Sequence, residues 1–336
     1  MKRVITLATF GIALFFSFAA CDKSAPANVP DSAKAVESAK KTIKVALILP
    51  GSISDASWNA GAYNGLVWLK EHRDDVETAY VEEISNEKAE ATLTIYAKEG
   101  YDIIFAFGSE FTANIIKVAQ QYPNVYFANT DQTRGLNLPA NVSTFAGDER
   151  AASFLVGALA GYLSRTDVVG TVEGFESPDL SSNTVHYFAG YKYVKPNGRT
   201  LNSYVGSWSD VEKAKQTALA QIEAGVGFIY ASGDAIGLGI IEASKEKSIP
   251  VVGYGTDLNE LAPKNIITSV IWNVGITFNA IVEDIKNGRF SNSIYYQGLE
   301  EGAIVLADYH GTVDSQTAAK IEEIKQKLSK GEIPLN

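Results

Sequence analysis

From Lys44 onward, short apolar runs of strand length alternate with segments of helix length, and this alternation limits the possible folds more than any other feature. An unbroken run such as residues 45–49 is typical of a strand buried on both faces. Strands that alternate with helices predict parallel sheets covered by helices. Because about eleven strands exceed what one compact sheet usually holds, we expect two sheets. The predicted strands span 44–49, 78–82, 102–106, 124–128, 143–146, 168–172, 201–205, 227–231, 249–254, 266–271 and 303–307.

An internal repeat supports two similar halves. Residues 100–131 and 225–257 both read Gly, buried strand, Gly, helix, Pro, buried strand, and both end in Thr-Asp. A repeat spaced by a whole domain indicates a duplicated lobe and excludes a solenoid. If the strand ends of two lobes face each other, they form a cleft. The matched pairs are Gly100 and Gly225, Gly108 and Gly233, Pro123 and Pro250, Asp131 and Asp257, Gly51 and Gly174, Asn59 and Asn183, and Gly65 and Gly190.

The turn after the first strand is a candidate binding site. In an open parallel sheet, ligands bind beyond the carboxyl ends of the strands, where the next helix begins. Asp55, Ser57, Trp58 and Asn59 fall at that point and offer a carboxylate, a hydroxyl, an indole and an amide. These groups suit a flat molecule with polar edges. The alternative is that Asp55 or Ser57 only caps the helix and Trp58 only packs in the core.

Further candidates lie at other strand ends. Asp131 and Asp257 would come from opposite lobes, although each could also be a turn or cap residue. Trp208 and Trp272, like Trp58, lie at or just after a predicted strand end. Aromatic planes suit a planar heterocycle, and aspartates suit its N–H groups or sugar hydroxyls.

The start of the chain predicts export and a lipid anchor. Lys2-Arg3 precede an apolar run that ends in small residues before Cys21, the only cysteine. This arrangement resembles a bacterial lipoprotein signal over residues 1–20, with lipidation, including palmitate, at Cys21. Residues 21–43 are poor in large apolar side chains after Cys21 and are expected to form a flexible tether. We therefore expect a protein on the periplasmic or extracytoplasmic face of a cell membrane.

Charge and motifs argue against several other functions. A net charge of −10 disfavours nucleic acid as a partner. The three histidines, His72, His186 and His310, are far apart and lack metal-ligand spacing, so we expect no metal. The sequence has no Walker loop or Gly-x-Ser-x-Gly elbow. We therefore expect a binding protein without catalytic residues and without a cofactor.

Five segments carry a family resemblance. They resemble the basic membrane protein family, which consists of lipoprotein substrate-binding components of ABC importers and includes a purine nucleoside receptor. The resemblance covers essentially all of residues 44–310. It implies the type I periplasmic-binding-protein fold, an α/β fold with two doubly wound parallel-sheet lobes joined by three crossings and a ligand cleft between them. The segments are DASWNAGAYNG, YPNVYFANTD, NVSTFAGDERAASFLVGALAG, GSWSDVEKAKQTALAQIEAGVGFIYASG and NIITSVIWNV.

The resemblance also implies roles for individual residues. Asp55 and Asn59 would contact the ligand, and Asp131 and Asp257 would bind base or ribose. Trp208 would stack on the base, and Gly233 would lie against the ligand. One residue departs from the family, because nucleoside-binding members carry a lysine where this chain has Trp272. The full set of predicted ligand-binding residues is Asp55, Trp58, Asn59, Ser109, Asp131, Asn183, Trp208, Gly233, Asp257 and Trp272.

Together these observations predict a monomeric receptor that captures a purine nucleoside and delivers it to an ABC permease. Riboflavin or another aromatic heterocycle is an alternative ligand. Alternatives of another class are an extracytoplasmic nucleoside hydrolase and a ligand sensor. Following the three-crossing pattern, lobe one is expected to comprise 44–147 plus 271–297, and lobe two 148–270 plus 298–336.

Overall fold

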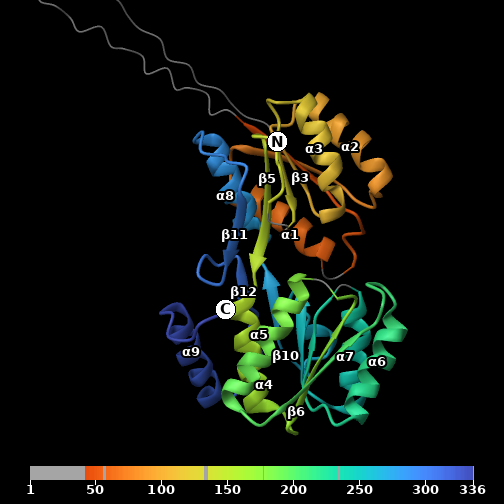
Figure 1. The fold of residues 1–336 in the computed structure, drawn as a ribbon, viewed down its shortest axis with the longest axis vertical. Helices are drawn as coiled ribbons and strands as arrows, with labels where there is room; N and C mark the ends of the chain where they lie inside the picture. Colours follow the sequence, from red (N-terminus) through yellow and green to blue (C-terminus); the bar gives the residue numbers. More distant parts are fainter. Residues whose placement is uncertain (1–41, 56–57, 132–134, 177, 234, 336) are drawn as a thin grey trace, which may run out of the picture. The chain divides into compact units, whose positions relative to one another are not determined.

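A computed structural model describes residues 42–55, 58–131, 135–176, 178–233 and 235–335. Cys21, the predicted signal peptide and the predicted tether up to residue 41 lie outside these residues. Within the described part, two six-stranded sheets are each covered by helices on both faces (Figure 1). No described helix is both long enough and apolar enough to span a lipid bilayer.

The two sheets have the same strand order. The first runs β11-β5-β4-β3-β1-β2 with every neighbouring pair parallel. The second runs β12-β10-β9-β8-β6-β7 and is parallel except for β12, which is antiparallel to β10. The strands of the first sheet are β1 Ile43–Ile48, β2 Val76–Val81, β3 Ile103–Ala106, β4 Tyr126–Thr130, β5 Val142–Asp148 and β11 Ile294–Gly298. Those of the second are β6 Val168–Glu173, β7 Arg199–Tyr204, β8 Ile229–Ala231, β9 Val251–Gly255, β10 Ile266–Trp272 and β12 Ile304–Leu306.

Helices connect the strands as the alternating pattern predicts. They are α1 Trp58–His72, α2 Asn86–Lys98, α3 Thr112–Gln121, α4 Arg150–Leu163, α5 Pro178–Val194, α6 Val211–Glu223, α7 Ile236–Lys247, α8 Val274–Lys286 and α9 Ser315–Ser329. Two short 3₁₀ turns, η1 Ser109–Phe111 and η2 Asn259–Leu261, lie near strand ends. The two equivalent strand orders confirm the predicted duplicated α/β architecture.

One strand was missed by the sequence analysis. The prediction of eleven strands did not include β11, which pairs with β5 at the edge of the first sheet. Its sequence, IYYQG, is mostly half-buried or exposed, so it lacks the apolar run that marks the central strands. The structure also shows the chain passing between the sheets after β5, after β10 and after β11. The predicted residue boundaries of the two lobes stay a prediction.

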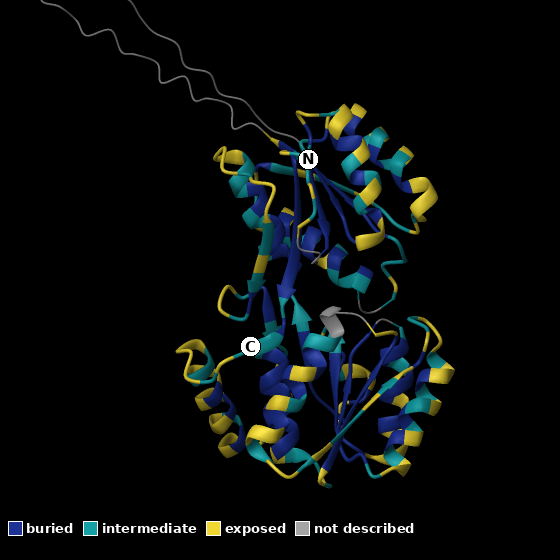
Figure 2. Ribbon diagram, in the orientation of Figure 1, coloured by how far each residue is buried: buried dark blue, intermediate teal, exposed yellow. Residues whose placement is uncertain are grey.

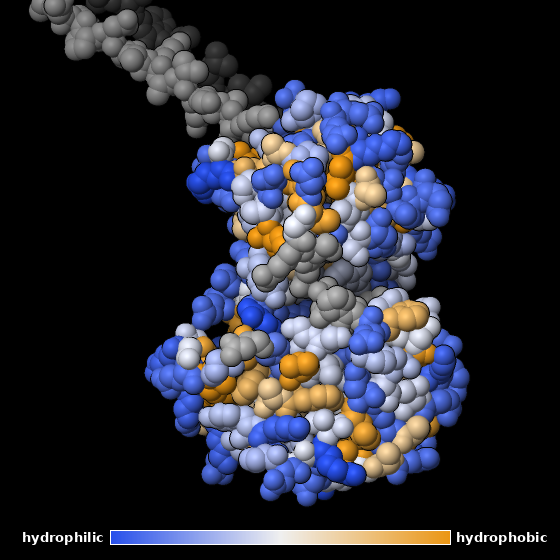
Figure 3. All heavy atoms as spheres, viewed as in Figure 1, coloured by the Kyte–Doolittle hydropathy of each residue, from blue (hydrophilic) through white to orange (hydrophobic). Residues whose placement is uncertain are grey.

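Each sheet is buried on both faces. In β1, Val45 and Leu47 pack into one apolar cluster, and Ala46 and Ile48 pack into another on the opposite face. The second sheet divides its buried residues between two further clusters in the same way. Figure 2 shows buried strands beneath helices whose outer faces are exposed. On the face drawn in Figure 3, hydrophilic residues cover α2, α3 and α9. The carboxylates of the central strands therefore lie at the strand ends, as with Asp148 in β5 and Glu173 in β6.

Small residues allow two pairs of helices to approach closely. A Cβ atom on Gly65 of α1 would lie 2.2 Å from Cγ1 of Val274, the first residue of α8. A Cβ atom on Gly190 of α5 would lie 1.9 Å from the carbonyl oxygen of Phe154 in α4. Gly65 and Gly190 are one of the matched pairs of the sequence repeat. The repeat thus marks the same helix contact in both halves.

A buried carboxylate joins α1, β2 and α8. Asp75 is 3% exposed and accepts hydrogen bonds from Arg73 at 2.9 Å and from Lys286 at 2.6 Å. Arg73 also pairs with Glu283 on α8. Burial alone would raise the pKa of Asp75, but the hydrogen bonds and charges of Arg73 and Lys286 outweigh it and lower this pKa to about 2.

We predict that Asp75→Asn lowers the free energy of unfolding at pH 7 by about 2 kcal/mol. Because the pKa of Asp75 is lower in the folded state, its stabilising contribution is present above about pH 4 and is lost as the pH falls toward about 2. Urea unfolding at several pH values measures both effects. The control Glu323→Gln, in an exposed pair with Lys327, should leave stability unchanged. An Asp75→Asn variant as stable as the parent at pH 7 would contradict the prediction.

Candidate functional site

An aromatic cluster lies where the chain leaves β10. Trp272, the last residue of β10, has its ring centroid 5.7 Å from that of Trp58, 5.5 Å from that of Phe107 and 6.1 Å from that of Phe145. It packs against one core cluster of each sheet. Its indole N–H is buried and has no hydrogen-bond partner within the described residues. Trp272 therefore both packs between the two cores and borders the strand ends.

A small cavity lies beside this cluster. It holds about 10 Å³, which is room for about one water molecule. The Trp58 indole N–H donates to the carbonyl oxygen of Phe107 at 3.4 Å. The residues that line the cavity are Trp58, Gly61, Ala62, Phe107, Tyr254, Gly255, Trp272 and Val274. Two of the predicted ligand-binding residues, Trp58 and Trp272, are thus brought together with residues of both sheets.

Asp55 and Asn59 fix the start of α1. The Asp55 carboxylate accepts hydrogen bonds from the backbone N–H groups of Asn59 at 2.8 Å and Ala60 at 3.0 Å, and from the side-chain amide of Asn59 at 2.7 Å. The Asn59 side-chain oxygen accepts from the backbone N–H of Gly51 at 3.1 Å. Through these hydrogen bonds the Asp55 carboxylate caps the start of α1, and Asn59 holds the turn at Gly51.

Asp131 and Ser109 lie close together at the end of the first sheet. Asp131 directly follows β4, is 8% exposed and accepts a hydrogen bond from the Thr112 hydroxyl at 2.6 Å. The same hydroxyl contacts the Ser109 carbonyl oxygen at 2.7 Å and accepts from Asn129 at 2.9 Å. Thr112, at the start of α3, therefore fixes the position of Asp131.

Asn183 lies in a buried polar group of the second half. Its side-chain amide donates to the carboxylate of Glu149, and the hydroxyl of Tyr254 donates to the other oxygen of that carboxylate at 2.8 Å. Glu149 is 7% exposed and Asn183 is 6% exposed. Glu149 follows β5 directly, so this carboxylate joins the first crossing to α5 and β9.

Trp208 and Gly233 are neighbours in the second half. The indole of Trp208 covers Gly174, because a Cβ atom there would lie 2.1 Å from Cε3 of the ring. Phe175 packs edge-on against Trp208, with ring centroids 5.5 Å apart. Gly233 has φ 153°, which favours glycine, and a Cβ atom there would lie 3.9 Å from Trp208. The structure therefore brings these two predicted residues together.

Asp257 has a different environment from its repeat partner Asp131. Its carboxylate accepts a hydrogen bond from the backbone N–H of Asn259 at 3.1 Å and lies 2.8 Å from Nε2 of His310, and the Asp257 side chain is 39% exposed. The N–H of Phe127 in β4 donates to the Asn141 carbonyl oxygen, and the N–H of Val251 in β9 donates to the Asn265 carbonyl oxygen. Phe127 and Val251 are therefore equivalent, which makes Gly255 the equivalent of Asp131 and places Asp257 two residues further along.

Sequence reasoning missed three residues that the site depends on. Glu149 was assigned to the start of a helix, Tyr254 to the end of a buried strand, and Thr112 to the start of another helix. Glu149 and Tyr254 are 105 residues apart, so no local pattern links them. A glutamate directly after a strand end was the only available signal. Within the described residues, no group of three or more acidic, histidine or cysteine side chains is placed to hold a metal ion.

A second buried acid lies at the end of β6. Glu173 is fully buried and accepts a hydrogen bond from the Thr184 hydroxyl. Burial raises the pKa of Glu173, and the hydrogen bonds from Thr184 and Asn202 only partly offset this effect. Glu173, which precedes the glycine covered by Trp208, thus favours its neutral form more than an exposed glutamate does.

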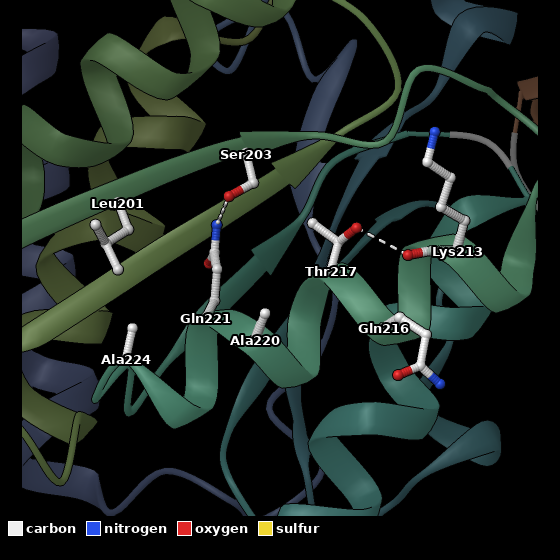
Figure 4. A pocket seen from close by; sticks show the side chains of 8 residues that line it. All are labelled: Leu201, Ser203, Lys213, Gln216, Thr217, Ala220, Gln221 and Ala224. Atoms are coloured by element: carbon white, nitrogen blue, oxygen red, sulfur yellow. Dashed lines mark hydrogen bonds between the residues drawn. The ribbon is translucent and has the colours of Figure 1, made fainter.

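A second cavity does not coincide with the predicted residues. A groove of about 490 Å³ lies between the edge strand β7 and α6 (Figure 4). Gln221 donates to Ser203 at 2.8 Å in its floor. The groove is lined by Leu201, Ser203, Lys213, Gln216, Thr217, Ala220, Gln221 and Ala224. None of these residues belongs to the strand-end group described above.

Comparison with known proteins identifies the family. The model of the Bmp family, described as "ABC transporter substrate-binding protein PnrA-like", matches residues 42–336. The chain belongs to the Bmp family. Proteins of this family bind a small molecule for an ABC transporter, whose permease is their partner. The resemblance found in the sequence is therefore confirmed at the level of the family.

Individual relatives agree with this assignment. Basic membrane protein A of Borreliella burgdorferi is 28% identical over 296 residues, which cover 86% of each chain. Transcriptional activator protein med of Bacillus subtilis is 24% identical and covers 88% of this chain and 92% of its own. A solved ABC transporter solute-binding protein from Conexibacter woesei has a TM-score of 0.76 at 25% identity, covering 88% of this chain and 99% of its own. These structural neighbours confirm the type I periplasmic-binding-protein fold.

We predict that Trp272→Lys lowers the free energy of unfolding of this Bmp-family protein by about 3 kcal/mol or more. The substitution removes an indole that packs on both cores and places an ammonium group among apolar rings. Urea unfolding measures the effect. The control Trp272→Phe keeps an aromatic ring and should cost less. A lysine variant as stable as the phenylalanine variant would contradict the packing role and leave Trp272 as a residue that only borders the ligand.

Proposed function

We propose that this protein captures a purine nucleoside between two lobes and delivers it to the permease of an ABC importer. The observation that carries the proposal is the aromatic surface at the strand ends of the second sheet. There the Trp208 indole is half-buried over Gly174 and beside Gly233. Such a partly exposed ring offers a stacking surface for a planar base. The proposed lobes are 44–147 plus 271–297 and 148–270 plus 298–336.

Polar groups near the strand ends suit the rest of a nucleoside. Asp131 offers carboxylate oxygens as acceptors for N–H or O–H groups, and Asn183 offers an amide. The ten predicted ligand-binding residues include three aspartates and no lysine or arginine. A ligand with a phosphate group would meet these carboxylates without a lysine or arginine of the set to bind the phosphate. This composition supports an uncharged nucleoside over a nucleotide, and riboflavin remains the alternative heterocycle.

We further propose that the chain is exported and held at the membrane surface by lipidation of Cys21, with the folded part on the extracytoplasmic face. The support is the order of basic, apolar and small residues before the single cysteine. In this arrangement the ligand is bound and released without being changed.

Ligand identity can be tested on the purified full chain. Mass spectrometry of the small molecules released on denaturation should find a purine nucleoside in stoichiometric amount. Incubation with inosine or adenosine should return the nucleoside intact, because binding without turnover is proposed. Release of a flavin would replace the ligand, and accumulation of free base would overturn the receptor function in favour of a hydrolase.

We predict that Asp131→Ala and Asp257→Ala each weaken nucleoside binding by about 1.5–3 kcal/mol, the scale of a charge-assisted hydrogen bond. Calorimetric titration with inosine and adenosine measures the affinity. Glu323→Ala on α9 serves as the control and should bind like the parent. If both aspartate variants keep the parent affinity, the proposed placement of these residues at the ligand is wrong. If only Asp131→Ala weakens binding, Asp257 does not contact the ligand and its role is the contact with His310.

A further inference from the structure

The two asparagines matched by the repeat have different hydrogen bonds. In the first half, both ends of the Asn59 side-chain amide are used, because the nitrogen donates to Asp55 and the oxygen accepts from Gly51. In the second half, the nitrogen of Asn183 donates to Glu149. Within the described residues the side-chain oxygen of Asn183 accepts no hydrogen bond. It is also not one of the fully buried side-chain atoms that lack a partner, so solvent reaches it. Asn183 therefore has an unused acceptor that Asn59 lacks.

The cause of this difference lies beside the matched glycines. The side chain of Asn59 occupies the space next to Gly51, where a Cβ atom would lie 2.7 Å from the amide nitrogen. The equivalent space next to Gly174 is filled by the indole of Trp208. Asn183 therefore cannot adopt the position of Asn59. Its nitrogen instead bonds to Glu149 from the first crossing.

Glu149 determines which end of the Asn183 amide faces outward. A carboxylate oxygen can only accept hydrogen bonds, so it must be the nitrogen of Asn183 that contacts Glu149. The second carboxylate oxygen accepts from the Tyr254 hydroxyl at 2.8 Å, which fixes the carboxylate itself. Because Glu149 is 7% exposed, water does not compete freely for these bonds.

We propose that Glu149 is a positioning residue that makes Asn183 a hydrogen-bond acceptor for the ligand, and that this acceptor selects nucleosides with a donor group. The inference rests on the proposed function. The donor is an exocyclic amine of the base or a ribose hydroxyl. A site with a fixed acceptor binds poorly to a ligand that lacks the matching donor, because the ligand then covers the oxygen without giving it a partner.

Matched ligands test this selection. Adenosine is titrated into the full chain by calorimetry, together with purine riboside, 2′-deoxyadenosine and 3′-deoxyadenosine, each of which lacks one donor of adenosine. The wild type should bind one of the three about tenfold or more weakly than adenosine. Asn183→Ala should bind that analogue and adenosine with similar affinity. Glu149→Leu should lose the same discrimination, because leucine has no acceptor to hold the amide nitrogen of Asn183.

Glu323→Leu on α9 is the control, since it makes the same change of side chain at an exposed glutamate away from the site. It should keep the discrimination, and melting curves show which variants are folded. If Glu149→Leu weakens all four ligands equally, Glu149 is only structural and the inference is wrong. If Glu149→Leu does not fold, discrimination that persists in Asn183→Ala overturns the inference by itself. If the wild type binds none of the four ligands, the proposed nucleoside function is wrong, and the inference that rests on it is wrong as well.

Discussion

A parallel sheet covered by helices on both faces places the charged side chains of its central strands at its ends, and the candidate site depends on this constraint. Along β1 the residues from Val45 to Ile48 are fully buried and apolar. Carboxylates appear where such strands stop, as with Asp131 after β4 and Glu149 after β5. Even there they stay largely buried, so each must find a partner within the protein. The resulting hydrogen bonds fix the orientation of the side chains before any ligand is present.

The crossings between the sheets are held by packing as well as by charge. Trp272 packs on a core cluster of each sheet where the chain leaves β10. At the other two crossings, β5 and β11 end in register at Asp148 and Gly298. Arg150 binds both carboxylate oxygens of Asp148, at 2.8 and 2.6 Å. Burial would raise the pKa of Asp148, but the arginine outweighs this effect and lowers the pKa. The elements that join the lobes are thus in direct contact with the residues of the site.

The sequence predicted the architecture because buried parallel strands and amphipathic helices leave local patterns. It missed β11 because an edge strand such as IYYQG needs no continuous apolar run. It paired Asp131 with Asp257 because both follow a threonine, yet strand register shows that Asp257 lies two residues further along. Those two residues place Asp257 beside His310, in an environment that Asp131 does not share. The link between Glu149 and Tyr254 spans 105 residues, and only the folded chain reveals it.

The repeat is most regular where packing leaves least freedom. Gly65 and Gly190 serve the same close helix contact in both halves, because a side chain at either position would overlap the facing helix. The strand ends are less constrained, since they border the outside of the core. There Gly51 adjoins Asn59, whereas Gly174 adjoins Trp208. The two copies of one motif therefore make different hydrogen bonds, Asn59 with Asp55 and Gly51 and Asn183 with Glu149, because the glycine of each half has a different neighbour.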